Sequence, residues 1–315
     1  MSSCKRCAPQ VFRCFDVLVF LIVVIIAILF RVPGLNLPLF IQGFYCDDAS
    51  ISYPYIPSTV PIGVVYSVGI IMNCLLILIA EIITYNKRKQ QGIQYLQADT
   101  VNRCCGFPVH PVLYEVAKYW ILFAFGLFLT MVTFDVTKNI VGRLRPNFLD
   151  VCQVNLTLVD CNNGPFRAYV VDDVCTGPIE DVLASRRSFP SGHSALAVYF
   201  MLYASLYLES RWSWHGSYLL KPFTQLCLMY LAFYVCVSRM LDNKHHLGDV
   251  FCGAFIGAIY ALIIVFWLSN LFHHRCGQDQ HEHDCCGTDT MLVEMNTTSS
   301  KKSIQYHLYC NNIDF

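Results

Sequence analysis

The chain has 315 residues, of which 55% are hydrophobic and only 14% are charged, against about 25% charged residues in ordinary soluble domains. Lys plus Arg and Asp plus Glu number 22 each, so the formal net charge is zero and charge gives no reason to expect a nucleic-acid-binding protein. The apolar content excludes a disordered chain, and a soluble domain of this composition would expose large apolar patches. The composition therefore predicts a polytopic membrane protein.

Six apolar stretches are candidate membrane spans, because about 20 mostly apolar residues cross a bilayer. No small-residue cleavage site follows the first stretch, so we interpret it as a retained anchor and not as a signal peptide. We predict an all-α bundle of six transmembrane helices over residues 15–272, between a cytosolic N-terminal tail, 1–14, and a flexible cytosolic C-terminal tail, 273–315. The stretches are residues 17–30, 60–80, 119–134, 194–208, 222–238 and 250–272.

The basic residues predict which way the helices cross the membrane. Cytoplasmic loops carry an excess of Lys and Arg, and the short connection after the second span holds Lys87, Arg88, Lys89 and Arg103. Six spans place both termini on the same side, so we expect both in the cytosol. The long loop over residues 135–190 then faces the lumen or the extracellular space.

The predicted outer loops carry features typical of an oxidising compartment. Asn155 begins Asn-Leu-Thr, an acceptor for N-glycosylation, whereas a second acceptor at Asn296 lies in the cytosolic tail and should go unused. Four cysteines in these loops are candidates for two disulfides with three possible pairings, and free thiols are the alternative. They are Cys46, Cys152, Cys161 and Cys175.

Three polar clusters lie at the outer ends of the predicted spans. The first follows the third span and runs from Lys138 through Arg145 to Pro146. The second, Ser-Phe-Pro-Ser-Gly-His-Ser over residues 188–194, begins the fourth span. The third cluster joins the fifth and sixth spans and comprises Ser238, Arg239, His245 and Asp249.

The first chemical feature of these clusters is a set of groups that bind anions. The side chains of Lys138, Arg145 and Arg239 are cations that suit phosphate oxygens. Ser191 and Gly192 at a helix start offer a hydroxyl and backbone N–H groups to an anion. Any one cation at a span end is usually an interfacial anchor, and a single Ser-Gly-His is usually a helix cap. Together these groups indicate a phosphoryl-transfer site in which cations replace a metal clamp.

The second chemical feature is a pair of histidines. His245 and Asp249 are four residues apart and lie on one helical face, where a carboxylate fixes the imidazole tautomer and makes the other nitrogen nucleophilic. The adjacent His246 leaves the nucleophile ambiguous by composition, and the spacing favours His245. His193 is a second histidine that can protonate a leaving oxygen.

The three clusters together resemble the motifs of the phosphatidic-acid phosphatase type 2 (PAP2) superfamily, and within it the animal lipid phosphate phosphatases. That family shows Lys-x6-Arg-Pro, Pro-Ser-Gly-His and Ser-Arg-x5-His-x3-Asp, and all three are complete here. The segment Gly-Phe-Tyr-Cys-Asp-Asp over residues 43–48 is also similar to the family. The resemblance covers residues 10–272 and implies a PAP2/haloperoxidase-like helical bundle.

The resemblance also implies a role for each motif residue. It implies that His245 attacks phosphorus and forms a phosphohistidine, that Asp249 orients His245, and that His193 protonates the departing alkoxide and then activates water. It implies no metal and no other cofactor. The residues implied to hold the phosphate oxygens are Lys138, Arg145, Ser191, Gly192 and Arg239.

The implied function is Mg²⁺-independent hydrolysis of lipid phosphate monoesters at the outer or luminal membrane face. The implied substrates are phosphatidate, lysophosphatidate, sphingosine 1-phosphate and ceramide 1-phosphate, and the family tends to form homo-oligomers. We expect an integral protein of the plasma membrane, with Golgi or endoplasmic reticulum as alternatives. One competing class is a lipid-binding or transporter-like protein without turnover, and another is a phosphatase of soluble or isoprenyl phosphates.

Overall fold

The computed structural model divides into two units, Met1–Phe272 and His273–Phe315. The second unit, which is the predicted C-terminal tail, lies outside the described residues. The structure describes residues 8–30, 38–90, 103–104, 107–108, 110–155, 157, 169–171, 174–212, 216–269 and 271–272.

The described chain is mostly helical. Two short antiparallel pairs are its strands: β1 (Phe44–Tyr45) with β4 (Tyr169–Val170), and β2 (Arg103–Cys104) with β3 (Phe107–Pro108). The helices are α1 (Ala8–Leu29), η1 (Ala49–Ile51), α2 (Ile62–Gln90), α4 (Pro111–Val141), α5 (Phe148–Cys152), α6 (Ile179–Ser185), α7 (Gly192–Arg211), α8 (Leu220–Leu241), α9 (Leu247–Leu262) and η2 (Ile263–Leu268).

Four helices within the described ranges are long and apolar enough to cross a membrane: Ile62–Gln90, Pro111–Val141, Leu220–Leu241 and Leu247–Leu268. The predicted helical membrane class is confirmed. The predicted first and fourth spans do not belong to this set. The first is a shorter apolar helix, Asp16–Leu29, and the fourth corresponds to α7.

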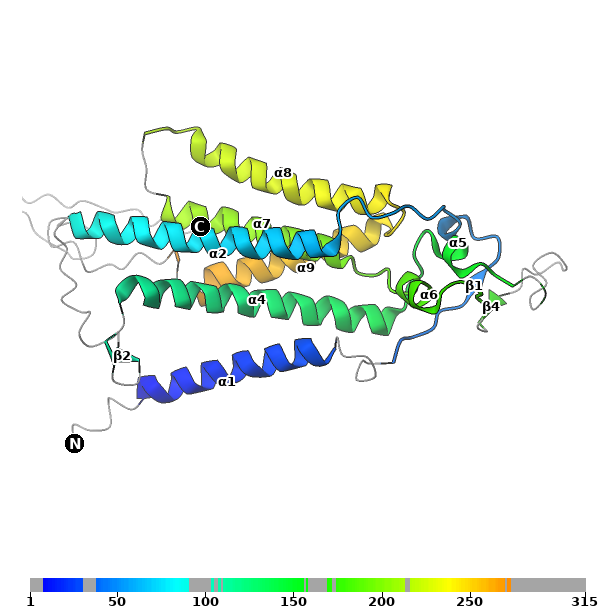
Figure 1. Ribbon diagram of the computed structural model, residues 1–315, viewed down its shortest axis with the longest axis horizontal. Helices are drawn as coiled ribbons and strands as arrows, with labels where there is room; N and C mark the ends of the chain where they lie inside the picture. The colour runs from blue at the N-terminus through cyan, green and yellow to red at the C-terminus, as the bar shows by residue number, and fades with distance from the viewer. Residues whose placement is uncertain are drawn as a thin grey trace, which may run out of the picture. The chain divides into compact units, whose positions relative to one another are not determined.

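The central position of α7 explains its lower apolar content. It packs against α2, α4, α8 and α9, and these helices run alongside one another in Figure 1. Its buried positions include tyrosines and serines, among them Tyr199, Tyr203 and Ser205. A helix surrounded by protein bonds such polar groups to its neighbours, as Tyr199 Oη does by donating to the Phe123 carbonyl oxygen at 2.6 Å.

Two glycines allow α9 to approach α7 closely. A Cβ on Gly253 would collide with the carbonyl oxygen of Ser191, and a Cβ on Gly257 with that of Ala195. Small residues four apart are a common way for membrane helices to bring their backbones together. As a result the Ser191 N–H donates to the Asp249 carbonyl oxygen at 2.9 Å, which joins the starts of the two helices.

A buried ion pair ties the opposite end of α7 to α2 and α4. Arg211 Nε lies 2.9 Å from Glu81 Oε1, and Tyr207 Oη donates to the same oxygen at 2.6 Å. A second guanidinium N–H of Arg211 donates to Tyr119 Oη at 2.7 Å. The buried carboxylate therefore has both a counterion and a hydrogen-bond donor, as a buried charge requires.

The connection between α1 and α2 and the connection between α4 and α7 form a small cap beyond one end of the bundle, where β1, β4, α5 and α6 lie together in Figure 1. Its apolar core includes Phe44, Phe148 and Val182. A disulfide joins Cys152 to Cys175 within it, which is one of the pairs that the sequence left open. Cys46 is also disulfide-bonded, and Cys161 lies outside the described residues.

The glycines make a testable prediction about packing. Gly257→Ala should lower the free energy of unfolding by about 1–3 kcal/mol, because the new methyl group overpacks a backbone contact. Gly63→Ala is the matched control, since no atom lies within 4 Å of its added Cβ and both changes replace a helical glycine. Thermal unfolding of the two variants in the same detergent tests this. Equal stability would contradict the role of Gly257 in bringing α9 to α7.

Candidate active site

The three motif segments meet at the capped end of the bundle because specific residues end or begin the helices there. Gly142 ends α4 in the left-handed conformation with φ 59°, where a Cβ would collide with the Phe40 carbonyl oxygen. Ser191 begins α7, and its hydroxyl oxygen accepts from the Ser194 N–H at 3.4 Å. His246 begins α9 in a capping box with Asp249.

Backbone hydrogen bonds hold the first motif against the second. Arg145 N–H donates to the Ser185 carbonyl oxygen at 2.8 Å, and Ser188 N–H donates to that of Arg143 at 2.9 Å. The loop that follows α4 therefore runs beside the loop that precedes α7. This pairing brings the Arg145 side chain to the segment that carries His193.

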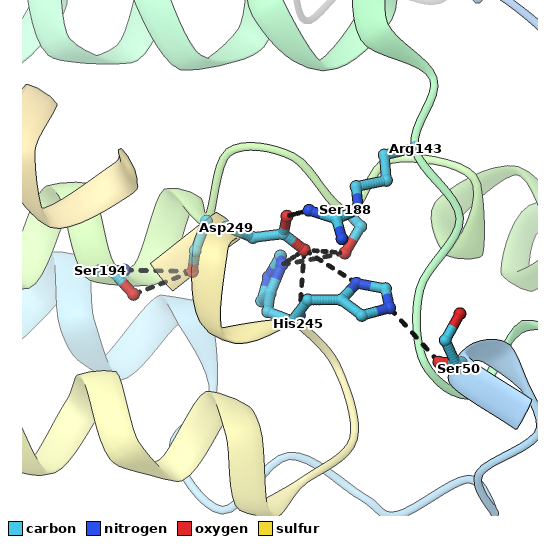
Figure 2. A network of polar contacts seen from close by, with 8 residues as sticks. Ser50, Arg143, Ser188, Ser194, His245 and Asp249 are labelled. Carbon is cyan, nitrogen blue, oxygen red and sulfur yellow. Dashed lines mark hydrogen bonds and ion pairs between the residues drawn. The ribbon is translucent and has the colours of Figure 1, made fainter. Parts of the chain in front are cut away.

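Asp249 is the centre of the polar network in Figure 2. One carboxylate oxygen accepts from Arg143 Nη1 at 2.7 Å. The other accepts from Ser188 Oγ at 2.5 Å and from the His246 N–H at 3.0 Å. Asp249 is fully buried, and these donors favour its charged form.

The nearest approach between Asp249 and His245 is 3.9 Å, from Oδ2 to Nδ1, which is too long for a hydrogen bond. His246 Nδ1 is closer, at 3.3 Å from the same oxygen. Ser188 Oγ lies between the two groups, 3.5 Å from His245 Nδ1. His245 lies before His246, the N-cap of α9, so the expected helical face shared by His245 and Asp249 is not formed, and a serine hydroxyl stands beside the imidazole instead.

His245 is buried with 4% of its surface exposed. Burial, and then the charges of Arg145 and Lys138, lower the pKa of His245 well below its usual value. The imidazole is therefore neutral at pH 7, which is the form that can act as a nucleophile. Its Nδ1 faces Ser188 and Asp249, so Nε2 is the nitrogen that is left for a ligand.

Arg239 and His193 form a second pair in the site. The Arg239 side chain is fully buried at 0% exposure and its Nη2 lies 2.7 Å from Asp242 Oδ2. Its Nη1 lies 3.4 Å from His193 Nε2. A fixed guanidinium thus stands directly beside the predicted acid.

Two further predicted cations lack carboxylate partners in the described part of the chain. Lys138 Nζ lies 5.7 Å from the centroid of the Phe134 ring. Arg145 Nε is buried without a hydrogen-bond acceptor, and burial together with the charge of Arg239 lowers the pKa of Arg145 to about 10. Cations crowded in this way and lacking acceptors are typical of a site built to receive an anion.

Ser191 and Gly192 form the start of α7, and the Ser191 hydroxyl is already engaged within that helix. Both are buried, and the Ser191 hydroxyl is used as the cap of α7 and as acceptor for Ser194 Oγ at 3.0 Å. Ser188 and Arg143, to which the sequence analysis gives no catalytic or phosphate-binding role, both contact Asp249. Ser188 is part of the second cluster, so its place in that cluster is the sequence feature that could have indicated its role. Within the described ranges no group of three or more His, Cys, Asp or Glu side chains is placed to hold a metal ion.

Comparison with known proteins identifies the family. The PAP2 superfamily model matches residues 119–273. Phospholipid phosphatase 2 of Rattus norvegicus is 35% identical over 248 residues, which are 77% of this chain and 82% of the rat protein. The chain belongs to the phospholipid phosphatases of the PAP2 superfamily.

Two other relatives agree. Phospholipid phosphatase 2 of Homo sapiens is 36% identical over 238 residues, 74% of this chain and 75% of the human protein. A putative phosphatidate phosphatase of Drosophila melanogaster is 35% identical over 237 residues, 73% of this chain, and that segment covers 62% of the fly protein. No solved structure matches. The sequence-based resemblance is thus confirmed, and the chain is a phosphatase.

The neutral state of buried His245 predicts a pH dependence of stability. The pKa of His245 is lower in the folded chain than in the unfolded chain, where it is about 6.5. As the pH falls below about 6.5, the unfolded chain therefore binds a proton at His245 and the folded chain does not. Stability is then lost by up to about 1.4 kcal/mol per pH unit. As the pH is lowered from 7.5 to 5.0, the thermal unfolding temperature should fall more steeply for the wild type than for His245→Gln. Parallel curves would contradict a neutral His245.

Proposed function

We propose that this phosphatase hydrolyses lipid phosphate monoesters through a covalent phosphohistidine on His245. The observation that carries the proposal is a buried neutral imidazole, 4% exposed, beside cations without carboxylate partners in the described chain. Lys138 and Arg145 would neutralise the charge of the phosphoryl oxygens, and Arg239 would do so next to His193. Preorganised charges of this kind are the main source of catalysis in phosphoryl transfer.

The first step transfers the phosphoryl group to the enzyme. Nε2 of His245 attacks phosphorus, a P–N bond forms, and the bond from phosphorus to the lipid oxygen breaks. His193 gives a proton to the leaving alkoxide, which departs as the lipid alcohol. The negative charge of the bound phosphate favours the protonated form of His193 that this step needs.

The second step releases phosphate. His193, now neutral, accepts a proton from a water molecule that attacks the phosphorus of the phosphohistidine. The P–N bond breaks and its electron pair returns to Nε2 of His245. Asp249 would hold the tautomer of His245 through Ser188, whose hydroxyl donates to the carboxylate at 2.5 Å. The Gly192 N–H at the start of α7 would bind a phosphoryl oxygen, whereas the Ser191 N–H already donates to the Asp249 carbonyl oxygen.

We also propose six spans, with α1 and α7 joining the four long apolar helices. Lys87, Arg88 and Lys89 occupy the last turn of α2, at the end away from the motif residues, which supports a cytosolic position for that end. The disulfide Cys152–Cys175 supports a luminal or extracellular position for the cap. Both termini would then be cytosolic, in a homo-oligomer that we place in the plasma membrane.

A site at the outer boundary of the bilayer suits lipid substrates, because the head group can meet the cations while the acyl chain stays in the membrane. The relatives are named phospholipid and phosphatidate phosphatases. We therefore propose phosphatidate, lysophosphatidate, sphingosine 1-phosphate and ceramide 1-phosphate as the substrate class.

Phosphate release tests the proposed reaction. In detergent micelles with excess EDTA, the purified wild type should release phosphate from lysophosphatidate and phosphatidate. His245→Ala should reduce release by several orders of magnitude, because no other group forms the covalent intermediate. Full turnover by His245→Ala would overturn the nucleophile. Absence of release by both proteins would favour a lipid-binding protein, once isoprenyl and soluble phosphates had also been tried.

Glycosylation tests the proposed membrane face. Asn155 is exposed to the enzymes of the lumen only if the cap lies on that side. In animal cells, glycosidase treatment should increase the gel mobility of the wild type and of Asn296→Gln, and it should not change that of Asn155→Gln. A shift that depends on Asn296 would reverse the proposed orientation.

A further inference from the structure

The segment between η1 and α2, residues 52–61, is bound to two of the motif loops. Tyr53 N–H donates to the carbonyl oxygen of Pro146, in the first motif, at 2.9 Å. Thr59 N–H donates at 2.8 Å to the same Asp242 carboxylate that pairs with Arg239. The segment is therefore part of the wall of the site, although it carries none of the motif residues.

Within this wall, the ring of Tyr55 holds a lysine that the motifs do not include. Lys244 Nζ lies 3.5 Å from the centroid of the Tyr55 ring, and Lys244 is 6% exposed. Tyr55 is fixed through its backbone N–H, which donates to Asp150 Oδ2 at 2.7 Å. The structure gives Lys244 Nζ no hydrogen bond to, and no ion pair with, any described residue. A largely buried lysine whose ammonium lies against an aromatic ring, with no carboxylate in contact, is stabilised when an anion joins it.

The backbone places Lys244 beside the phosphate-binding cations. Its N–H donates to the Arg239 carbonyl oxygen at 3.1 Å, and it directly precedes His245. Burial, followed by the charge of Arg145, lowers the pKa of Lys244 to about 8, with Asp242 acting in the opposite direction. At pH 7 the side chain is still charged, so it adds a further positive charge to the group that Arg145 and Arg239 already form.

We propose that Lys244, held by Tyr55, is a further phosphate-binding residue of this site, and that residues 52–61 complete the site by holding it. This inference rests on the proposed phosphatase reaction. The ammonium would donate to a phosphoryl oxygen on the side that Arg145 also faces. Because the charge acts on phosphate in the ground state and in the product, its loss affects KM and product inhibition more than kcat.

The experiment compares Lys244→Met and Lys244→Arg with the wild type. Lys244→Met should raise KM for lysophosphatidate and the inhibition constant for inorganic phosphate by about tenfold, the loss expected for one charge-assisted hydrogen bond, with kcat within about twofold. Lys244→Arg should keep both constants near the wild-type values. Lys221→Met is the matched control, because Lys221 pairs with Glu209 at 2.6 Å and belongs to no motif loop.

Two variants of Tyr55 test whether its ring holds Lys244, and they leave the charge of Lys244 in place. Tyr55→Leu should raise the same two constants, whereas Tyr55→Phe, which retains the ring, should not. They also cover the case in which Lys244→Met fails to fold. Unchanged constants in Lys244→Met, or in Tyr55→Leu if the first variant is unfolded, would overturn the proposal. Equal increases of the two constants in Lys244→Met and Lys244→Arg would also overturn the proposal, because they would indicate that Lys244 acts through packing.

A binding measurement separates this inference from the proposed reaction. Inorganic phosphate should raise the thermal unfolding temperature of the wild type, and the increase should be smaller in Lys244→Met at the same phosphate concentration. Failure of the reaction alone would appear as a wild type that binds phosphate and releases none from lipid. Failure of the inference alone would appear as an active wild type and an equal thermal shift in Lys244→Met.

Discussion

The close approach of α9 to α7 is the constraint on which the site depends. It is possible only because Gly253 and Gly257 have no side chain at the contact. The approach allows the hydrogen bond from Ser191 to the backbone of Asp249, so the starts of the two helices become one unit. His193 of the second motif then lies with its Nε2 3.4 Å from Arg239 Nη1, and the N–H of His245 in the third motif donates to the Arg239 carbonyl oxygen at 3.3 Å.

Charge is distributed unevenly among the side chains of the site, and the distribution explains the chemistry of the site. Asp249 and Asp242 are engaged by Arg143 and Arg239 respectively. Lys138 and Arg145 have no such carboxylate among the described residues. The site therefore holds more positive charge than its own carboxylates neutralise, which is unfavourable in a buried place unless a ligand supplies the negative charge. Burial, together with the same excess of positive charge, lowers the pKa of His245 and leaves the imidazole neutral and available as a nucleophile.

The sequence identifies the motif residues as candidates for the site, because their chemistry is carried by side-chain type and spacing. It could not predict which of them contact each other. The spacing of His245 and Asp249 predicted one helical face, but His245 precedes the N-cap of α9. The carboxylate of Asp249 bonds instead to Ser188 and to the backbone of His246. Likewise the apolar run of α7 predicted a membrane span, but it did not indicate that the tyrosines and serines of this helix are buried among four other helices.

The sequence by itself determined the class of the protein, since a chain with 55% hydrophobic residues must bury its backbone polar groups in helices wherever it meets lipid. It also determined the phosphatase motifs and the cysteines of the cap. Only the tertiary structure decided that Cys152 pairs with Cys175, that Gly257 sets the distance between two helices, and that Tyr55 supports Lys244. These contacts join residues far apart in the chain, and their geometry depends on how whole helices pack, which no local pattern encodes.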